Sequence, residues 1–594
     1  MERPQTDQVH DAWNPGLKSS IPKKYLPLST MFATENVSTS FTEAHELGDF
    51  SGIDPMKIVA FRPERLLVHE LLLRLMADFT IDAGSKYKDL GINVRKAADD
   101  IYDRFIKPNL DTIIKGHAQL RQRVEKYLAD ELTKQFSTGE SEKSADSQEK
   151  TGSGWFGWLK KSDKKPATLI TPEQKAHQVL EHWQAAIADC DDPFEKSCLM
   201  ALHWTVSNIV RHRGALVGDH SIAITIAANV VCNNYGSEQV GRAIEPYLAQ
   251  AVEQRGYRLL PPQEKPIIMN VKGASGAGKS TMRQQQKKLA KRLGVDWDDF
   301  ALISPDIWRK FLLDYDSLGE AYKYAGMLSG HEIEIIDKKL DQYMAAKASR
   351  NEMSHLLIDR FRFDSFIADG NPTQDSKLLS RFGDTIFMFF MITPPDATVE
   401  RAWLRGLEFG RYKAVDDLLY HNVEAFTGMP ALFFNWAGVA DKKVHYEFLD
   451  NSVAKGKLPR TVAFGWNGEM TILDIKCLLD IDRYTKINVD ADCPQDVYSP
   501  NDMAAQDNIG FLKKCTRLIP AINFADHQTG KIYSRMENGK WVWRDEEYVA
   551  KLKPTSQEKI ALDGIGWSDA SDNLPDISPP KNLEEKKTYT LGEW

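Results

Sequence analysis

Residues 267–280 read IIMNVKGASGAGKS, and this stretch decides the fold. Its first five residues are mostly apolar and are typical of a short buried β-strand. The next part matches G-x-x-x-x-G-K-[ST], and a helical pattern follows over residues 281–294, which is the order of strand, glycine-rich loop and helix in a P-loop. The loop residues are Gly273, Ala274, Ser275, Gly276, Ala277, Gly278, Lys279 and Ser280. We therefore expect an α/β P-loop core with a parallel sheet.

The residue types of this loop suit phosphate binding. Glycines let backbone N–H groups converge on phosphate oxygens, and the start of the following helix adds positive charge. Lys279 can reach the β- and γ-phosphates, Ser280 can bind Mg²⁺, and we include Thr281 among the nucleotide-binding residues. We expect ATP and Mg²⁺ as cofactors. The sequence has no Asn-Lys-x-Asp motif for reading guanine, which favours ATP and leaves GTP as the alternative.

Two further apolar runs lead into an acidic residue. Residues 300–303 precede Asp306, and residues 356–358 precede Asp359. Ligands gather at the carboxyl ends of parallel strands, so both carboxylates should face the phosphates. We predict that Asp306 accepts the proton of an attacking hydroxyl, with a helix cap as the alternative role. Asp359 follows its strand as a Walker B acid does and is expected to hold Mg²⁺, directly or through water.

Arginines follow the next apolar run, residues 385–392. The helical pattern after it places Arg401 and Arg405 four residues apart on one face, and Gly406 and Gly410 indicate a mobile turn before Arg411. Arginines on such a lid suit phosphoryl transfer, because they can close over the γ-phosphate as its charge redistributes. The alternative is a surface helix with solvated arginines.

The order of motifs resembles a known family. GASGAGKS is followed by ISPDIWR, EAYKYAGMLSGHEIEIID, LLID, FFMITPPDATVERAWLRGLEFGRY and VHYEFLDNS, and this order over residues 265–474 is similar to the zeta toxin group of P-loop kinases and to the kinase half of phage-type polynucleotide kinases. The resemblance implies that Asp306 is the general base, that Arg405 and Arg411 are the lid arginines, and that Lys279 and Ser280 serve the nucleotide. It also implies phosphorylation of a sugar nucleotide, the substrate class of zeta toxins.

Two arginines bear on the phosphate acceptor. Polynucleotide kinases often have Asp-x-Thr-Asn after the central strand, whereas this chain has Asp359 followed by Arg360 and Phe-Arg-Phe. Arg309 resembles the arginine with which polynucleotide kinases hold the acceptor's phosphate. It could equally hold the diphosphate of a sugar nucleotide or lie on a helix surface. We expect Arg309 and Arg360 to contact the substrate.

Three functions follow from these residues. The leading hypothesis is an ATP-dependent phosphotransferase that phosphorylates a hydroxyl of a nucleotide-containing small molecule such as a sugar nucleotide. The second is a 5′-hydroxyl polynucleotide kinase. The third is a nucleotide-gated interaction protein whose helical blocks, linker aromatics or C-terminal tail bind a protein partner.

The pattern along the chain predicts six segments. Residues 1–60 read as an irregular arm, 61–136 and 169–262 as mainly α-helical blocks, and 263–480 as the P-loop kinase domain. Residues 137–168 have the composition of a disordered linker, in which Trp155 and Trp158 beside lysines indicate contact with a membrane surface, with a partner or with their own domain. Residues 481–594 read as a mixed, irregular C-terminal extension with one hairpin near residues 531–543 and a loosely ordered tail.

Composition limits the remaining functions. The chain has 594 residues, more than one core can organise, and a formal net charge of −8, so we expect no broad nucleic-acid binding. Six cysteines form no CxxC pair, and the first residues carry acidic side chains without an apolar run. These features predict a cytoplasmic protein without a disulfide framework or a signal peptide.

Overall fold

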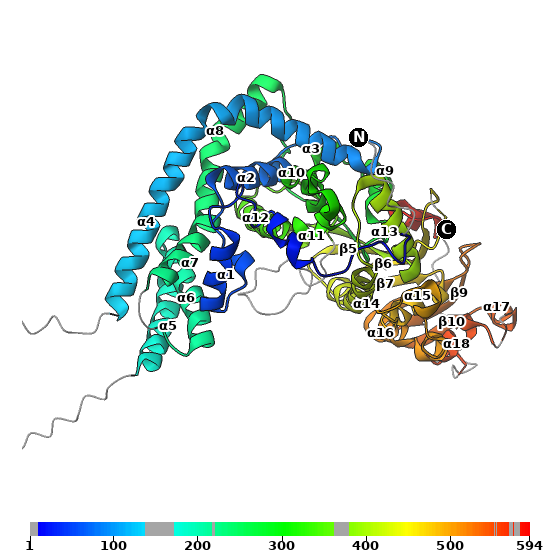
Figure 1. Ribbon diagram of the computed structural model, residues 1–594. Coiled ribbons are helices and arrows are strands. Elements are labelled where there is room, and N and C mark those ends of the chain that lie inside the picture. Colours follow the sequence, from blue (N-terminus) through cyan, green and yellow to red (C-terminus); the bar gives the residue numbers. More distant parts are fainter. Residues whose placement is uncertain are drawn as a thin grey trace, which may run out of the picture. The chain divides into compact units, whose positions relative to one another are not determined.

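The computed structural model describes residues 10–136, 171–216, 220–360, 379–454, 456–551, 553, 555–568, 574 and 583–594. The chain divides into two compact units (Figure 1). Unit 1 comprises residues 1–30, 72–101 and 250–594, and unit 2 comprises residues 31–71 and 102–249. These units differ from the six consecutive segments that the sequence predicts, because each unit packs together stretches that are distant in the chain. Residues 137–168, with Trp155 and Trp158, lie outside the described residues.

Unit 2 is helical. Its core includes the buried Trp183, whose indole N–H donates to Glu131 Oε1 at 2.9 Å. Helix α1 lies where the sequence predicts an irregular arm, and the reciprocal cap between Ser40 and Glu43 is the signal for its start. The helices are α1 (Phe41–Ser51), α4 (Leu110–Phe136), α5 (Pro172–Asp189), α6 (Pro193–Arg213) and α7 (Ser221–Val231), while α2 (Pro63–Asp78) and α8 (Ser237–Arg255) have residues in both units.

Unit 1 contains a ten-stranded sheet in the order β10-β9-β8-β7-β6-β5-β4-β1-β3-β2. The strands are β1 (Ile267–Lys272), β2 (Phe300–Ile303), β3 (His355–Ile358), β4 (Thr385–Ile392), β5 (Lys443–Asp450), β6 (Arg460–Trp466), β7 (Glu469–Ile472), β8 (Ala521–Ala525), β9 (Ile532–Glu537) and β10 (Lys540–Arg544). Strands β2, β3, β1, β4 and β5 are parallel neighbours in that order. Their carboxyl ends therefore lie along one edge of the sheet, and the expected α/β fold with parallel core strands is confirmed.

The parallel strands are apolar at nearly every position because they are buried on both faces. In β4 every residue after Thr385 is buried. Phe390 of β4 stacks on Phe448 of β5, with ring centroids 4.9 Å apart, and meets the edge of Phe433. This aromatic packing joins β4 to β5, and β4 also pairs with β1, so the carboxyl ends of the three strands lie together.

Helices accompany the sheet in unit 1. They are α3 (Tyr87–Ile101), α9 (Arg283–Arg292), α10 (Arg309–Leu312), α11 (Ala325–Leu328), α12 (Gly330–Ser349), α13 (Pro395–Phe409), α14 (Val415–Ala437), α15 (Ile475–Arg483), α16 (Gly510–Leu518), α17 (Glu546–Lys551) and α18 (Gln557–Asp563). Within the described ranges, no helix has the continuous apolar length that a bilayer crossing requires.

Residues 481–594 continue the sheet and do not form a separate extension. Strand β8 pairs parallel with β7, and β9 and β10 follow antiparallel as the hairpin that the sequence predicts. The hairpin turns at Asn538 and Gly539, both with positive φ. Figure 1 shows this part in orange, with α15, α16 and α18 close to β9 and β10. The sheet continues across the segment boundary predicted at residue 480, because β8 pairs with β7.

The final residues of the chain are bound to the sheet, which corrects the prediction of a loose tail for this part. Glu593 accepts from the Thr461 N–H and donates its own N–H to Pro459 O, both at 2.9 Å. The fully buried carboxylate of Glu447 accepts from the Leu591 N–H at 2.7 Å and the Gly592 N–H at 3.1 Å. A single buried acid thus fastens the segment.

Glu447 makes stability depend on pH. Burial raises the pKa of Glu447 from 4.5 to about 7, although the bonds from Leu591, Thr461 and Gly592 oppose the rise. Between these values the folded chain holds a proton that the unfolded chain has released, so this group costs stability as pH rises from about 4.5 to 7. We expect the free energy of unfolding of Glu447→Gln, relative to wild type, to increase by up to about 3 kcal/mol across this window.

Equilibrium unfolding of both proteins between pH 5 and 8 measures this difference. The quantity compared is how the difference in unfolding free energy between the two proteins changes with pH. Its value at any one pH is not used, since the glutamine also loses one hydrogen-bond acceptor. Parallel profiles for the two proteins would contradict the assignment.

Candidate functional site

The glycine-rich loop leaves β1 at the middle of the carboxyl edge. Gly276 has φ 85° and Gly278 has φ 95°, a region that other residues avoid. A Cβ on Gly278 would lie 2.5 Å from Asn451 Nδ2, which instead donates to Ala277 O at 2.7 Å. Thr393, after β4, donates to the same carbonyl at 3.1 Å. The ends of β4 and β5 therefore hold the loop from behind.

Lys279 folds over this loop. Its ammonium donates to Gly273 O at 2.8 Å and Ala274 O at 2.9 Å. Burial lowers the pKa of Lys279 to about 8, while the nearby carboxylates of Asp359 and Asp306 oppose the shift. The amine therefore lies in the field of both acids that the sequence places at this edge.

Ser280 and Asp359 meet at the start of the helical segment. Ser280 Oγ donates to Asp359 Oδ2 at 2.8 Å. A hydroxyl and a carboxylate at this distance are oxygen ligands of the kind that Mg²⁺ prefers, so the two side chains fit the metal role predicted for them. Among the described residues, no cluster of three or more His, Cys, Asp or Glu side chains suited to a metal is present.

Asp306 is not a helix cap. The residue before the short helical segment at Pro305–Trp308 is Ser304, and the Asp306 carboxylate instead accepts from Arg309 Nε at 2.9 Å and from Arg411. Burial alone would raise the pKa of Asp306, but the two guanidinium groups hold it well below its usual range. The side chain keeps 40% of its surface exposed. Asp306 is thus an accessible carboxylate that is charged at neutral pH.

The arginines of α13 have different roles. Arg401 donates to Asn451 O at 2.7 Å and Val453 O at 3.2 Å, and so supports the backbone next to the glycine-rich loop. Arg405, one turn later on α13, carries a positive charge that helps to lower the pKa of Lys279. Gly406 is a packing position, since a Cβ there would lie 2.4 Å from the Tyr412 ring. The mobile turn predicted from Gly406 is therefore corrected, whereas Gly410 ends α13 in the left-handed conformation.

Arg360 does not point to a substrate. Its guanidinium pairs with Asp337 at 2.7 Å and with Asp341 at 2.5 Å, both on α12, and 6% of its side chain is exposed. Arg309 also donates to Gly326 O and Ser329 Oγ, so it is tied to the start of α12 as well as to Asp306. Arg360, predicted to contact the substrate, instead has its charge held by two partly buried carboxylates.

Sequence reasoning missed a cluster next to these arginines. Lys413 Nζ lies 3.3 Å from Asp417 Oδ2 and bonds with His421 Nδ1. Burial lowers the pKa of Lys413 to about 8, opposed by Asp417 and enhanced by Arg405. Burial and then Lys413 lower the pKa of His421 to about 4, so the imidazole is neutral. The available signal was the four-residue spacing of Lys413, just before α14, and of Asp417 and His421 on α14.

Comparison with known proteins adds little. No model of a known protein family matches the chain, and no curated protein matches it. A solved structure from a molecular and structural characterization of the PezAT chromosomal toxin-antitoxin system of Streptococcus pneumoniae is 15% identical. The match covers 36% of this chain and 78% of that one, with a TM-score of 0.23. This is a weak and distant similarity, and it decides neither the fold nor the function.

Proposed function

We propose that the protein is an ATP-dependent phosphotransferase of the P-loop kinase type. The observation that carries this proposal is the meeting, at one edge of a parallel sheet, of a glycine-rich loop with Lys279 and a charged, accessible carboxylate between two arginines. Phosphoryl transfer is mainly positioning and charge stabilisation, and these groups supply both. GTP in place of ATP remains compatible with the same residues.

Each side chain of the site has a separate role in the proposed transfer. A hydroxyl oxygen of the acceptor attacks the γ-phosphorus, the bond to the leaving nucleoside diphosphate breaks, and Asp306 takes the hydroxyl proton. Lys279, Arg405 and Arg411 balance the phosphate charge. Mg²⁺ held at Ser280 and Asp359 would neutralise the β- and γ-phosphate oxygens. Phosphates compete for the arginines that now bond Asp306, and loss of these partners raises the pKa of Asp306 and makes it a stronger base.

We propose a sugar nucleotide or a related nucleotide-containing small molecule as the acceptor. In this proposal Arg309, which is three residues after Asp306 and bonded to it, holds a phosphate of the acceptor near the base. Incubation with γ-labelled ATP and separate UDP-sugars, nucleosides and 5′-hydroxyl oligonucleotides tests this. We expect label on a UDP-sugar. Label only on oligonucleotides would mean that the acceptor is a 5′-hydroxyl oligonucleotide and not a small molecule. Label on none of the acceptors would contradict the proposed phosphotransferase activity.

Removal of the loop lysine tests nucleotide binding directly. We expect Lys279→Ala to weaken ATP binding on the order of 10- to 100-fold, because a charge-assisted contact to phosphate contributes about 1.5–3 kcal/mol. Isothermal titration of the full chain measures the affinity. Lys287→Ala, an exposed lysine of α9, is the matched control and should bind as wild type. Equal affinities in all three proteins would contradict a role of this loop in ATP binding.

A further inference from the structure

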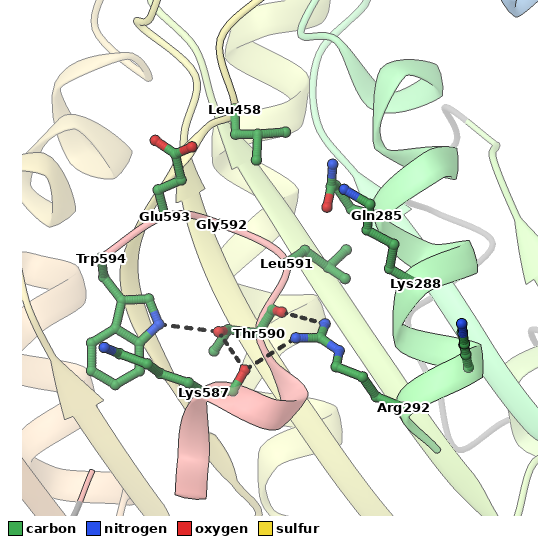
Figure 2. A pocket seen from close by; sticks show the side chains of 11 residues that line it. Gln285, Lys288, Arg292, Leu458, Lys587, Thr590, Leu591, Gly592, Glu593 and Trp594 are labelled. Atoms are coloured by element: carbon green, nitrogen blue, oxygen red, sulfur yellow. Dashed lines mark hydrogen bonds between the residues drawn. The ribbon is translucent and has the colours of Figure 1, made fainter. Parts of the chain in front are cut away.

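A cavity of about 880 Å³ lies between α9 and the C-terminal segment of the chain (Figure 2). It has the size of pockets that hold small molecules. One wall is a single face of α9, and the other is formed by residues 587–594 with Leu458. The cavity does not include the glycine-rich loop, so it is separate from the site described above.

The cavity is lined by cations. Lys288, Lys291 and Arg292 come from successive turns of one face of α9, and Lys587 comes from the opposite wall. Glu593 is the acidic residue among the lining residues, and Figure 2 shows it at the end of the cavity away from Arg292. The chain as a whole carries a net charge of −8, so this cationic lining opposes the overall charge. A concave surface with one sign of charge concentrates ligands of the other sign.

The walls are fixed in place by hydrogen bonds. Arg292 donates to Thr590 O at 2.8 Å and to Lys587 O at 3.4 Å, and the Trp594 indole N–H donates to Thr590 Oγ1 at 3.1 Å. Figure 2 shows the two Arg292 bonds joining α9 to the segment, and the Trp594 bond within the segment. Lys587 Nζ lies 4.7 Å from the centre of the Trp594 ring, which holds its charge at the cavity. The buried Glu447 fastens the same segment from below.

We propose that this cavity binds a polyphosphate group, that is, two or more linked phosphates of a small molecule. Lys288 and Lys291 are three residues apart on α9, about 5–6 Å between their Cβ atoms, which suits adjacent phosphates better than a single one. Lys587 approaches the same ligand from the opposite wall. Free inorganic polyphosphate and a nucleoside di- or triphosphate share this chemistry.

Occupancy of the cavity bears on the glycine-rich loop through α9. This helix begins directly after the loop, and its other end carries Arg292. A ligand that binds Lys288, Lys291 and Lys587 bridges α9, the helix that follows the glycine-rich loop in the chain, to the C-terminal segment.

The test uses the full chain with Lys279→Ala, so that binding at the glycine-rich loop is weakened and failure of the proposed function does not affect the result. Isothermal titration with sodium tripolyphosphate, and separately with ATP, measures binding. We expect both to bind, and Lys288→Glu in the same background to weaken binding at least 10-fold. Lys287→Glu changes the net charge equally at an exposed position outside the cavity lining and should weaken it less than threefold.

The outcomes separate the possibilities. Tighter binding of ATP than of tripolyphosphate identifies the nucleotide as the source of the phosphates, and equal binding identifies the polyphosphate group alone. If Lys288→Glu and Lys287→Glu weakened binding to the same degree, net charge alone would explain the change. That result would overturn the proposal. Absence of binding of both tripolyphosphate and ATP would also overturn it.

Discussion

We expect the replacement of Asp306 by Asn to lower kcat by about 10²- to 10⁴-fold, which is the range that a general base contributes. Asparagine has nearly the same shape and can accept one hydrogen bond from Arg309 or Arg411, but it cannot take the hydroxyl proton. The arginines remain in place to bind phosphate, so we expect the affinity for ATP to change by less than about threefold. A large fall in kcat at unchanged ATP affinity separates a base from a structural residue.

Asp306→Asn is measured with whichever acceptor the labelling panel identifies. Initial rates give kcat, and titration calorimetry gives ATP affinity. Asp316→Asn, a change of the same type at an aspartate of the neighbouring helical segment, should leave both unchanged. Unaltered turnover in Asp306→Asn would show that another group takes the proton, and would favour a protein in which nucleotide binding, rather than transfer, is the function.

Arg411→Ala is expected to lower kcat by about 10³- to 10⁵-fold, the contribution of an arginine that stabilises charge in phosphoryl transfer. The reason lies in its partner. Arg411 bonds Asp306, its side chain is 20% exposed, and its positive charge acts on Lys279 of the glycine-rich loop. Its removal also frees the Asp306 carboxylate from one of the two charges that lower its pKa. We therefore attribute the fall in kcat to weaker stabilisation of the phosphate charge, since Asp306 is still present as the base.

Arg411→Lys distinguishes charge from geometry. Lysine keeps the charge but lacks the planar fork that can bond two oxygens, so we expect it to restore part of the activity lost in the alanine variant. Arg350→Ala is the control, since Arg350 is half exposed and pairs with Glu352 on the surface. Unfolding transitions of all variants should agree within a few degrees. A comparable loss in Arg350→Ala, or no loss in Arg411→Ala, would contradict the assignment.

The strands and the turn chemistry were accessible from the sequence. The apolar runs at 267–271, 300–303 and 385–392 are buried strands, and Asn538-Gly539 forms the hairpin turn. Each of these signals is local, because a buried strand needs only consecutive apolar residues and a turn needs only residues that tolerate positive φ. The expectation that Lys279, Ser280 and Asp359 lie along one edge followed from their positions after apolar runs read as parallel strands, whose carboxyl ends share an edge.

Side-chain partners were not accessible in the same way. Arg360 and Arg309 both follow a strand near an acid. In the structure, however, Arg360 forms an ion pair with Asp337 of α12, whereas Arg309 bonds Asp306. The partner of an arginine is the nearest carboxylate in space, and neither Asp337 nor Asp341 is near Arg360 in the chain. The cluster at Lys413 was missed because its charges cannot be weighed without knowing their burial.

By itself, the sequence determined an α/β core with a glycine-rich loop after its first strand and acids after the next two, since the local backbone conformation follows from the pattern of neighbouring residues. Only the tertiary structure decided that residues 481–594 extend the same sheet, that the final residues close against α9 and Glu447, and that Asp306 sits between Arg309 and Arg411. Strand pairing, burial and charge pairing join residues distant along the chain, and their energies exist only once the chain has folded.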